Sequence, residues 1–170
     1  MSDEIGRLWA PWRCEYIESA VKEPDGCFLC EALQAGNDRE RLILQHDELT
    51  FLIMNLYPYN NGHLLLAPNR HVGELDDLST DELTAVAELT RQAVRWLDAV
   101  YKPHGYNIGL NLGRIAGAGL PGHIHWHIVP RWDGDTNFMP VLGCVKVISE
   151  GLRVGYDKIR QAIEKGDSKV

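Results

Sequence analysis

The sequence predicts an α+β fold, in which an antiparallel meander sheet of about five strands packs against one principal helix. Short apolar segments of strand length, bounded by turn formers, lie on both sides of one long amphipathic segment. The links between neighbouring strand segments are short, which favours antiparallel pairing. With 170 residues and 45% hydrophobic composition, the chain is expected to form one domain, with a core at about 27–142 and an extension at each end.

The strands are predicted from apolar and β-branched runs that stop at turn formers. A turn is predicted at Asn60-Asn61-Gly62, because these residues tolerate a positive φ. The third strand follows this turn, and Pro68 ends it. The loop 113–122 separates the fourth strand from the fifth. The predicted strands are 41–45, 50–54, 63–67, 106–112 and 124–129.

One long helix is predicted between the third and fourth strands. Ser79-Thr-Asp-Glu82 has the form of a capping box, in which the serine and glutamate side chains each accept a backbone N–H at the start of a helix. Apolar residues then recur at helical spacing as far as Tyr101, and Pro103 and Gly105 end the pattern. The helix is expected to bury its apolar face against the sheet.

Charge and composition exclude several classes of protein. Seventeen basic against twenty-four acidic residues give a formal charge of −7, which argues against broad binding to nucleic acid. The apolar runs are far shorter than the roughly 20 residues that span a bilayer, so no membrane segment is expected. The N-terminus lacks a signal-peptide core, and a Cys27-Phe-Leu-Cys30 pair suits a reducing compartment, so a cytoplasmic location is predicted.

Three histidines alternate with apolar residues in His123-Ile124-His125-Trp126-His127. A period of two places the three imidazoles on one face of a strand. Two kinds of chemistry fit this arrangement. The histidines could hold a zinc ion whose bound water attacks the substrate, or a neutral imidazole could attack phosphorus directly and form a covalent phosphoramidate. The spacing alone leaves both alternatives open.

The motif resembles the His-φ-His-φ-His-φ-φ signature of the histidine-triad (HIT) superfamily, where φ is a hydrophobic residue. Residues 55–68 resemble the upstream strand pair of that family. The segments 8–13, 104–113 and 130–138 resemble the Fhit-like branch of diadenosine tetraphosphate phosphorylases and hydrolases. This resemblance covers most of residues 27–142 and implies a HIT-like fold, a homodimer, and a nucleoside polyphosphate as substrate.

The resemblance also implies roles for individual residues. His125, the middle histidine, would take up the nucleotidyl group. His127 and His63 would flank the phosphate, with His123 completing the catalytic histidines. Asn55 stands eight residues before His63, where family members hydrogen-bond the ribose.

Two further positions would contribute to nucleotide binding. Asn111 lies in the strand that supplies a polar contact on the phosphate side of family members. Gly119 is a departure, because the hydrolase branch usually carries glutamine or another polar residue four positions before the first triad histidine. In its place, backbone N–H groups of Ala116-Gly-Ala-Gly119 could approach the phosphate, since glycine lets a backbone come close to a ligand.

The pair Cys27 and Cys30 has the spacing of a zinc knuckle but needs two further ligands. A metal-free thiol pair and a redox-active pair are the alternatives. By resemblance to zinc-containing members of the superfamily, the remaining ligands would be His71 and His123. Such a site is structural, because four protein ligands leave no position for an activated water. Magnesium could accompany a polyphosphate substrate.

Other functions stay open on the sequence alone. One is a purine-nucleoside phosphoramidase of the smaller triad branch, and another is a nucleotide-binding signalling protein whose slow hydrolysis is incidental. The choice between water and phosphate as the group that accepts the nucleotide is also open. Arg70, Arg114 and Arg131 are the cations nearest the motif in sequence, and they could hold polyphosphate in an otherwise acidic protein.

Overall fold

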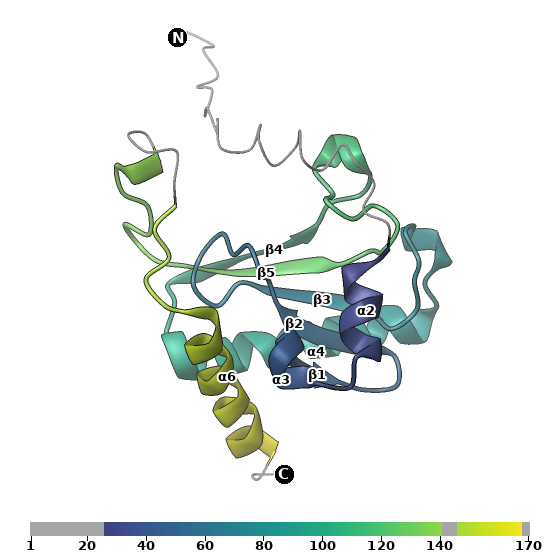
Figure 1. The fold of residues 1–170 in the computed structure, drawn as a ribbon, viewed down its shortest axis with the longest axis horizontal. Coiled ribbons are helices and arrows are strands. Elements are labelled where there is room, and N and C mark those ends of the chain that lie inside the picture. The colour runs from purple at the N-terminus through teal and green to yellow at the C-terminus, as the bar shows by residue number, and fades with distance from the viewer. Residues whose placement is uncertain (1–25, 141–145, 168–170) are drawn as a thin grey trace, which may run out of the picture.

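The structure, a computed structural model, describes residues 26–140 and 146–167. It confirms the α+β class, with a five-stranded antiparallel sheet in the order β1-β2-β3-β5-β4 (Figure 1). The strands are β1 (Ile43–His46), β2 (Thr50–Met54), β3 (Leu64–Pro68), β4 (Gly105–Leu110) and β5 (Trp126–Arg131). The helices are α2 (Phe28–Gln34), α3 (Asp38–Arg41), α4 (Thr80–Tyr101) and α6 (Leu152–Asp167), with short 3-10 turns η1 (Leu75–Asp77) and η2 (Arg114–Ala116).

The sheet begins as a simple meander and then changes its order. Strands β1, β2 and β3 pair consecutively, whereas β5 pairs with β3 and leaves β4 at the edge. Every residue of β2 and β3 is buried, so both faces of these two central strands are covered. The register pairs Leu65 of β3 with His127 of β5. This pairing brings the histidine motif beside the start of β3.

Helix α4 covers one face of the sheet and begins where the capping box predicted. The Ser79 side chain accepts the Glu82 N–H, and the Glu82 side chain accepts the Ser79 N–H. The helix contacts β2 and β3, and Val86, Leu89 and Leu97 are among its buried residues. Figure 1 shows α4 behind the sheet, with α2 in front of it.

Helix α6 covers the β1 edge of the sheet. Its Tyr156 hydroxyl donates to the Ile43 carbonyl at 3.0 Å, and its Arg160 guanidinium donates to the Leu44 carbonyl at 2.6 Å. Strand edges present unpaired backbone groups, and these two side chains satisfy carbonyls of β1. The first strand begins later than expected, because α3 runs to Arg41 and its C-cap, Leu42, has a left-handed φ of 64°.

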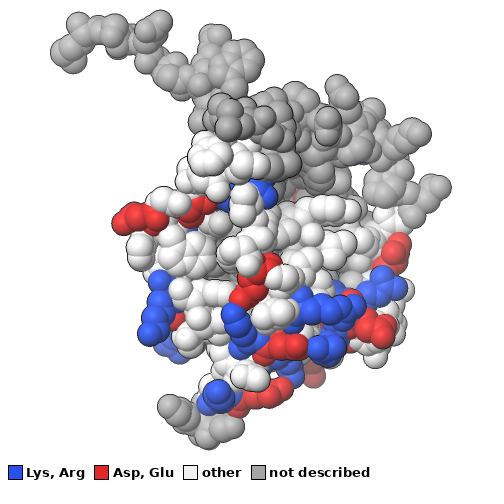
Figure 2. Space-filling view, turned by 60° about the vertical axis from the view of Figure 1, so that its left-hand side comes forward, with Lys and Arg blue, Asp and Glu red and all other residues white. Residues whose placement is uncertain are grey.

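Charged side chains of both signs share one face of the molecule. On the face shown in Figure 2, lysine and arginine side chains are interspersed with aspartate and glutamate. This face does not carry the concentrated positive charge that sequence-independent nucleic-acid binding uses. Within the described residues, no helix combines the length and the apolar character needed to cross a membrane.

Candidate active site and metal centre

Three of the predicted histidines lie together at the junction of β3 and β5. His63 immediately precedes β3, and His125 immediately precedes β5, which carries His127. The ring centroids of His63 and His127 are 5.2 Å apart, and those of His125 and His127 are also 5.2 Å apart. Residues that are distant in the sequence therefore form one cluster of imidazoles.

A tight turn places His63 in the cluster. Gly62 has a φ of +71°, and a Cβ at this position would lie 2.9 Å from Cε2 of Tyr101 in α4. Glycine alone combines this backbone conformation with so close an approach to a helix. The following residue, His63, is then fully buried.

Hydrogen bonds determine which nitrogen of His63 carries the proton. Its Nδ1 accepts the Tyr59 N–H at 3.0 Å and lies 3.2 Å from the Asn55 amide nitrogen, a donor. Burial is the main cause that lowers the pKa of His63 to about 3, and the neighbouring His127 and His125 contribute in the same direction. The ring is therefore neutral at physiological pH, with its proton on Nε2, which lies 3.0 Å from His127 Nδ1. His127 accepts at Nδ1 and so presents an N–H at Nε2.

The orientation of His125 follows from one backbone contact. Its Nδ1 lies 2.8 Å from the His123 carbonyl, which can only accept, so Nδ1 carries the proton. Burial lowers the pKa of His125, although the bond to the His123 carbonyl opposes this effect. The ring is neutral, and Nε2 holds an unshared electron pair.

The three predicted nucleotide-binding residues differ in their contacts with the histidine cluster. The Asn55 side chain contacts His63, and its Oδ1 accepts the Tyr57 N–H at 2.9 Å, which fixes the orientation of the amide. Asn111 and Gly119 are both partly buried. Within residues 26–140 and 146–167, neither forms a hydrogen bond to the histidine cluster.

The imidazole of His123 belongs to a second cluster. We expected the three triad imidazoles on one face of a strand, but β5 begins only at Trp126. Before it, the Ile124 N–H donates to the Val72 carbonyl at 2.7 Å, so this segment packs against the loop that follows β3. The ring of His123 consequently lies 5.1 Å from that of His71 and contacts the cysteines.

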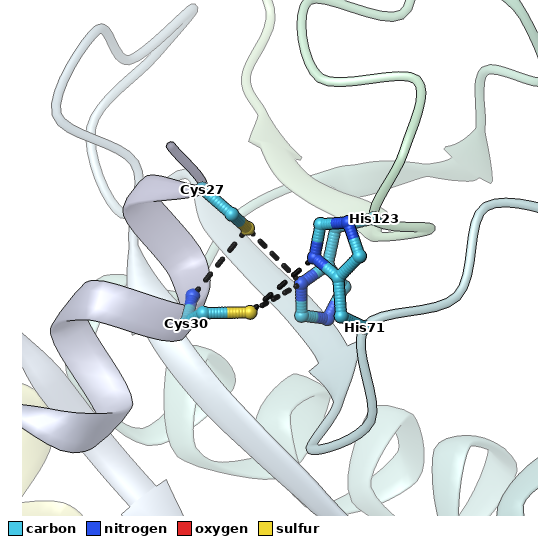
Figure 3. A group of neighbouring side chains, drawn as sticks. All are labelled: Cys27, Cys30, His71 and His123. Atoms are coloured by element: carbon cyan, nitrogen blue, oxygen red, sulfur yellow. Dashed lines mark hydrogen bonds between the residues drawn. The ribbon is translucent and has the colours of Figure 1, made fainter. Parts of the chain in front are cut away.

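Figure 3 shows Cys27, Cys30, His71 and His123 with their sulfur and nitrogen atoms directed toward one another. All four ligand atoms lie within 4.8 Å of each other. The Cys27 sulfur is 3.2 Å from His123 Nδ1, and the Cys30 sulfur is 3.4 Å from Nδ1 of both histidines. The structure thus brings together all four residues of the predicted metal site.

The donor set fits zinc. Zinc bonds of about 2.3 Å to sulfur and about 2.05 Å to nitrogen, at tetrahedral angles, put sulfur and nitrogen about 3.5 Å apart. The three sulfur–nitrogen distances given above, 3.2, 3.4 and 3.4 Å, agree with this value. His123 Nε2 lies 2.9 Å from the Pro68 carbonyl and so carries the proton, which leaves the Nδ1 electron pair facing the thiols.

An ion pair holds the segment that carries His71. The Arg70 guanidinium donates from Nε and from one terminal nitrogen to the two carboxylate oxygens of Glu82, each at 2.7 Å, and also to the Asp77 carbonyl at 2.7 Å. The Arg70 hydrogen bonds are the main cause that lowers the pKa of Glu82 to about 2. Arg70, which we considered for phosphate binding, instead binds Glu82 in the first turn of α4.

The Arg131 guanidinium is likewise bound to a carboxylate. It donates to both carboxylate oxygens of Asp135, at 2.5 and 3.0 Å, and to the Asn107 amide oxygen at 2.6 Å. Asp135 is nearly buried and also accepts from the Asn60 amide at 2.8 Å. These contacts fix the loop after β5 against the turn that precedes His63.

The structure adds Tyr59, which sequence reasoning missed. Its ring centroid lies 4.7 Å from that of His63 and 5.8 Å from that of His127. A tyrosine between Pro58 and Asn60 reads as an ordinary turn residue, so the sequence offered no signal for this contact.

Known proteins resemble the chain in sequence and in fold. The HIT domain model matches residues 37–134. An AP-4-A phosphorylase of Mycobacterium tuberculosis is 41% identical over 157 residues, which are 89% of this chain and 80% of the relative. An asymmetrical bis(5'-nucleosyl)-tetraphosphatase of Schizosaccharomyces pombe is 34% identical over 93 residues, which are 55% of this chain and 50% of the relative.

A similar fold is found in a solved structure, a Zn-bound histidine triad family protein from Mycobacterium smegmatis. It has a TM-score of 0.69 and 24% identity, and the match covers 85% of this chain and 98% of that one. The family model matches more than half of the chain, and the mycobacterial phosphorylase is similar over most of both sequences. The chain, with its triad and its five-stranded sheet, therefore belongs to the HIT family.

Proposed function

We propose that this protein cleaves diadenosine tetraphosphate or a related nucleoside polyphosphate by transferring a nucleotidyl group to His125. The names of the relatives support the substrate class, since one is an AP-4-A phosphorylase and another a bis(5'-nucleosyl)-tetraphosphatase. The observation that carries the mechanism is the bond between His125 Nδ1 and the His123 carbonyl. It leaves a neutral imidazole whose Nε2 electron pair can attack phosphorus.

The first step forms a bond between His125 Nε2 and the α-phosphorus and breaks the bond from that phosphorus to the leaving oxygen. The electron pair of the broken bond goes to the leaving oxygen. His127 Nε2–H donates a hydrogen bond there, because its Nδ1 is occupied by His63. A donor held in place before the reaction stabilises the developing charge without reorganisation.

The imidazoles of His63 and His127 are both neutral, and this state suits a phosphate leaving group better than an amine leaving group. A polyphosphate leaves as a weakly basic anion and needs a hydrogen bond, whereas an amine must receive a proton. His63 cannot readily supply one, since its pKa is lowered to about 3, chiefly by burial. A phosphoramidase is therefore the less favoured alternative.

Nucleotide binding in this proposal falls to Asn55, Asn111 and Gly119. Asn55 would hydrogen-bond the ribose, because its amide is held beside His63 and is only partly buried. Asn111 would contact the phosphate side, and the backbone near Gly119 would approach phosphate oxygens. Magnesium would enter as part of the polyphosphate substrate. Within the described residues, the one cluster with metal-ligand geometry is made of cysteines and histidines.

We further propose that Cys27, Cys30, His71 and His123 hold a structural zinc ion. Bound there, zinc would supply cross-links between α2, the loop after β3 and the segment before β5. It would not activate water, because four protein ligands fill a tetrahedral site. This arrangement leaves His125 free to act as the nucleophile.

We also propose a homodimer that forms through β4. Within the described residues β4 pairs on one side only, and Ile108 and Leu112 are exposed large apolar side chains in and just beyond it. The opposite edge of the sheet is covered by α6. An open edge with apolar side chains is suited to pairing with a second copy. Sedimentation of the wild type and of Ile108→Lys would test this, with a dimer expected only for the wild type.

The proposed reaction is tested by product analysis with diadenosine tetraphosphate, with and without inorganic phosphate. We expect phosphate to accept the nucleotide, giving ADP and ATP, in line with the name of the relative that is 41% identical. AMP and ATP without phosphate would instead identify a hydrolase.

His125→Ala should abolish turnover while the fold remains intact. Substantial activity in this variant would disprove the nucleophilic role of His125. Adenosine 5'-phosphoramidate should be included, because cleavage of this compound alone would favour a phosphoramidase. Very slow release of product from a tight complex would indicate a nucleotide-binding protein.

A further inference from the structure

Two loops that are distant in the sequence supply the histidines of the candidate metal site. His71 lies in the loop after β3, and His123 lies in the segment before β5. Each ring has its Nδ1 3.4 Å from the sulfur of Cys30 (Figure 3). A metal ion would therefore be shared by the two loops, so the distance between the loops decides whether all four ligands can reach it.

The two loops touch at Gly73, where backbone meets backbone. A Cβ added to Gly73 would lie 2.7 Å from the Pro121 carbonyl oxygen and 3.3 Å from Gly122 Cα. The φ of Gly73 is outside the left-handed region, so a side chain is excluded here by lack of space and not by the backbone conformation. Both obstacles are backbone atoms, which cannot rotate away as the end of a long side chain can. Only glycine lets the loops come this close.

Gly122 makes a second close contact, with the ring of His71. A Cβ at Gly122 would lie 3.3 Å from His71 Nε2, whereas the other ring nitrogen, Nδ1, faces the sulfur of Cys30. The φ of Gly122 is also outside the left-handed region. A methyl group at this position would displace the His71 ring, and the ligand atom would move with the ring.

The displacement at Gly73 is larger than a metal site tolerates. Non-bonded carbon and oxygen atoms lie about 3.3 Å apart in their closest favourable contacts, so a Cβ at Gly73 would separate the two loops by about 0.6 Å. Metal–ligand distances in proteins hold to within about 0.2 Å. After a separation of that size, His71 and His123 could not both bind one ion at normal bond lengths.

Hydrogen bonds connect the same contact to the proposed nucleophile. The Val72 carbonyl forms one planar peptide unit with the Gly73 nitrogen, and it accepts the Ile124 N–H at 2.7 Å. This N–H belongs in turn to the peptide unit of the His123 carbonyl, which accepts from His125 Nδ1 at 2.8 Å. Two peptide units and two hydrogen bonds therefore join Gly73 to the imidazole of His125.

We propose that Gly73 and Gly122 are positioning residues, whose missing side chains let the two loops close on one metal ion and hold the His123 carbonyl toward His125. The inference rests on the proposed zinc site and, for His125, on the proposed nucleotidyl transfer. A side chain at Gly73 separates the loops and lowers the affinity for zinc. It also turns the His125 ring, so the Nε2 electron pair is no longer aligned with phosphorus.

Chelator competition measures the affinity for zinc, and steady-state kinetics with diadenosine tetraphosphate gives kcat and KM. Gly73→Ala should lower the affinity for zinc about 10- to 100-fold, the range found for residues that support metal ligands. It should lower kcat about 10-fold with little change in KM, since a misplacement of about 1 Å costs about 100-fold. Gly122→Ala should lower the affinity for zinc by less, because the His71 ring can yield in part.

Gly151→Ala is the matched control. Gly151 precedes α6, and its φ is also outside the left-handed region. Among the described residues, a Cβ at Gly151 would meet nothing within 4 Å beyond its chain neighbours. This variant should keep the zinc affinity, kcat and KM of the wild type. Thermal unfolding of each variant measures any general loss of stability.

The possible outcomes separate the parts of the inference. Zinc affinity at the wild-type value in Gly73→Ala would overturn it, and an equal fall in Gly151→Ala would show a general loss of stability instead. Lower zinc affinity with unchanged kcat would refute the connection to His125. If Gly73→Ala does not fold, the zinc affinity of Gly122→Ala decides, and a wild-type value overturns the inference. A wild type that binds no zinc would show that the metal site itself is wrong, whereas one that binds zinc but cleaves no diadenosine tetraphosphate would remove only the step to His125.

Discussion

Acid should destabilise this protein to an unusual degree through His63. The side chain is fully buried, and its pKa is lowered to about 3, chiefly by burial and then by His127 and His125. In an unfolded chain a histidine has a pKa of about 6.5. Between these two values the unfolded state binds a proton that the native state does not. The free energy of unfolding therefore falls as the pH is lowered from 6.5 toward 3.

The size of the effect follows from the width of this window. Each pH unit within it changes the free energy of unfolding by about 1.36 kcal/mol. The full shift corresponds to about 5 kcal/mol, and the part lost between pH 7 and pH 5 is about 2 kcal/mol. Because His63 is fully buried, solvent screening should not reduce this contribution. Domains are stable by only about 5–15 kcal/mol in total, so the loss is easily measured.

Urea unfolding of the wild type and of His63→Gln at pH 7 and pH 5 measures the contribution. The wild type should lose about 2 kcal/mol more than the variant over this interval. Contributions of distant groups are common to both proteins and cancel in the difference. His46→Gln serves as the control, because His46 is exposed at the end of β1, where its Nε2 lies 3.5 Å from the Asp38 carboxylate. Parallel pH profiles for the wild type and His63→Gln would refute the neutral buried state on which the proton assignment depends.

Three further changes test other parts of the structure. Glu82→Gln should lower the free energy of unfolding by about 1.5–3 kcal/mol, because charged hydrogen bonds with Arg70 are lost, and it should weaken zinc binding in a chelator competition through the adjoining His71. Asn55→Ala should raise KM for the nucleotide more than it lowers kcat. Cys27→Ser should remove zinc from the purified protein, and chelation should then lower the Tm of the wild type but not of the variant.

Some elements could be predicted closely because their signals are local. The strand 50–54 was predicted with the bounds that β2 has, since its apolar run is bounded by turn formers on both sides. The capping box predicted the start of α4 correctly. In both cases the residues that decide the conformation lie within a few positions of each other, so tertiary packing reinforces the local preference.

Helix α6 was not predicted, although its pattern is present in the sequence. Tyr156, Ile159 and Ile163 follow one another at helical spacing and are all buried. Gly155 lies in the first turn, and glycine weakens a helix by about 1 kcal/mol relative to alanine. The helix is stabilised by its contacts with α4 and β1, which the sequence alone does not reveal.

The residues of the candidate metal site could be predicted, but the orientation of His63, His125 and His127 could not. Cys27, Cys30, His71 and His123 follow from a motif and a resemblance, and the structure brings them together. The proton positions of His63 and His127 depend on the Tyr59 N–H, whose direction is set by the turn conformation. A sequence specifies that a turn exists more readily than it specifies where each N–H points.

One short segment serves both clusters. The His123 imidazole lies with the cysteines, while its carbonyl accepts the N–H of His125 two residues later. The His123 carbonyl and the Ile124 N–H belong to one planar peptide unit, and this N–H donates to the Val72 carbonyl at 2.7 Å, so the bond restricts the direction of the His123 carbonyl. A metal ion bound by His71 and His123 would hold together the two segments that this bond joins, and with them the acceptor that determines which nitrogen of His125 is free. In the proposed mechanism, such an ion would therefore act on His125 without contact between the ion and the substrate.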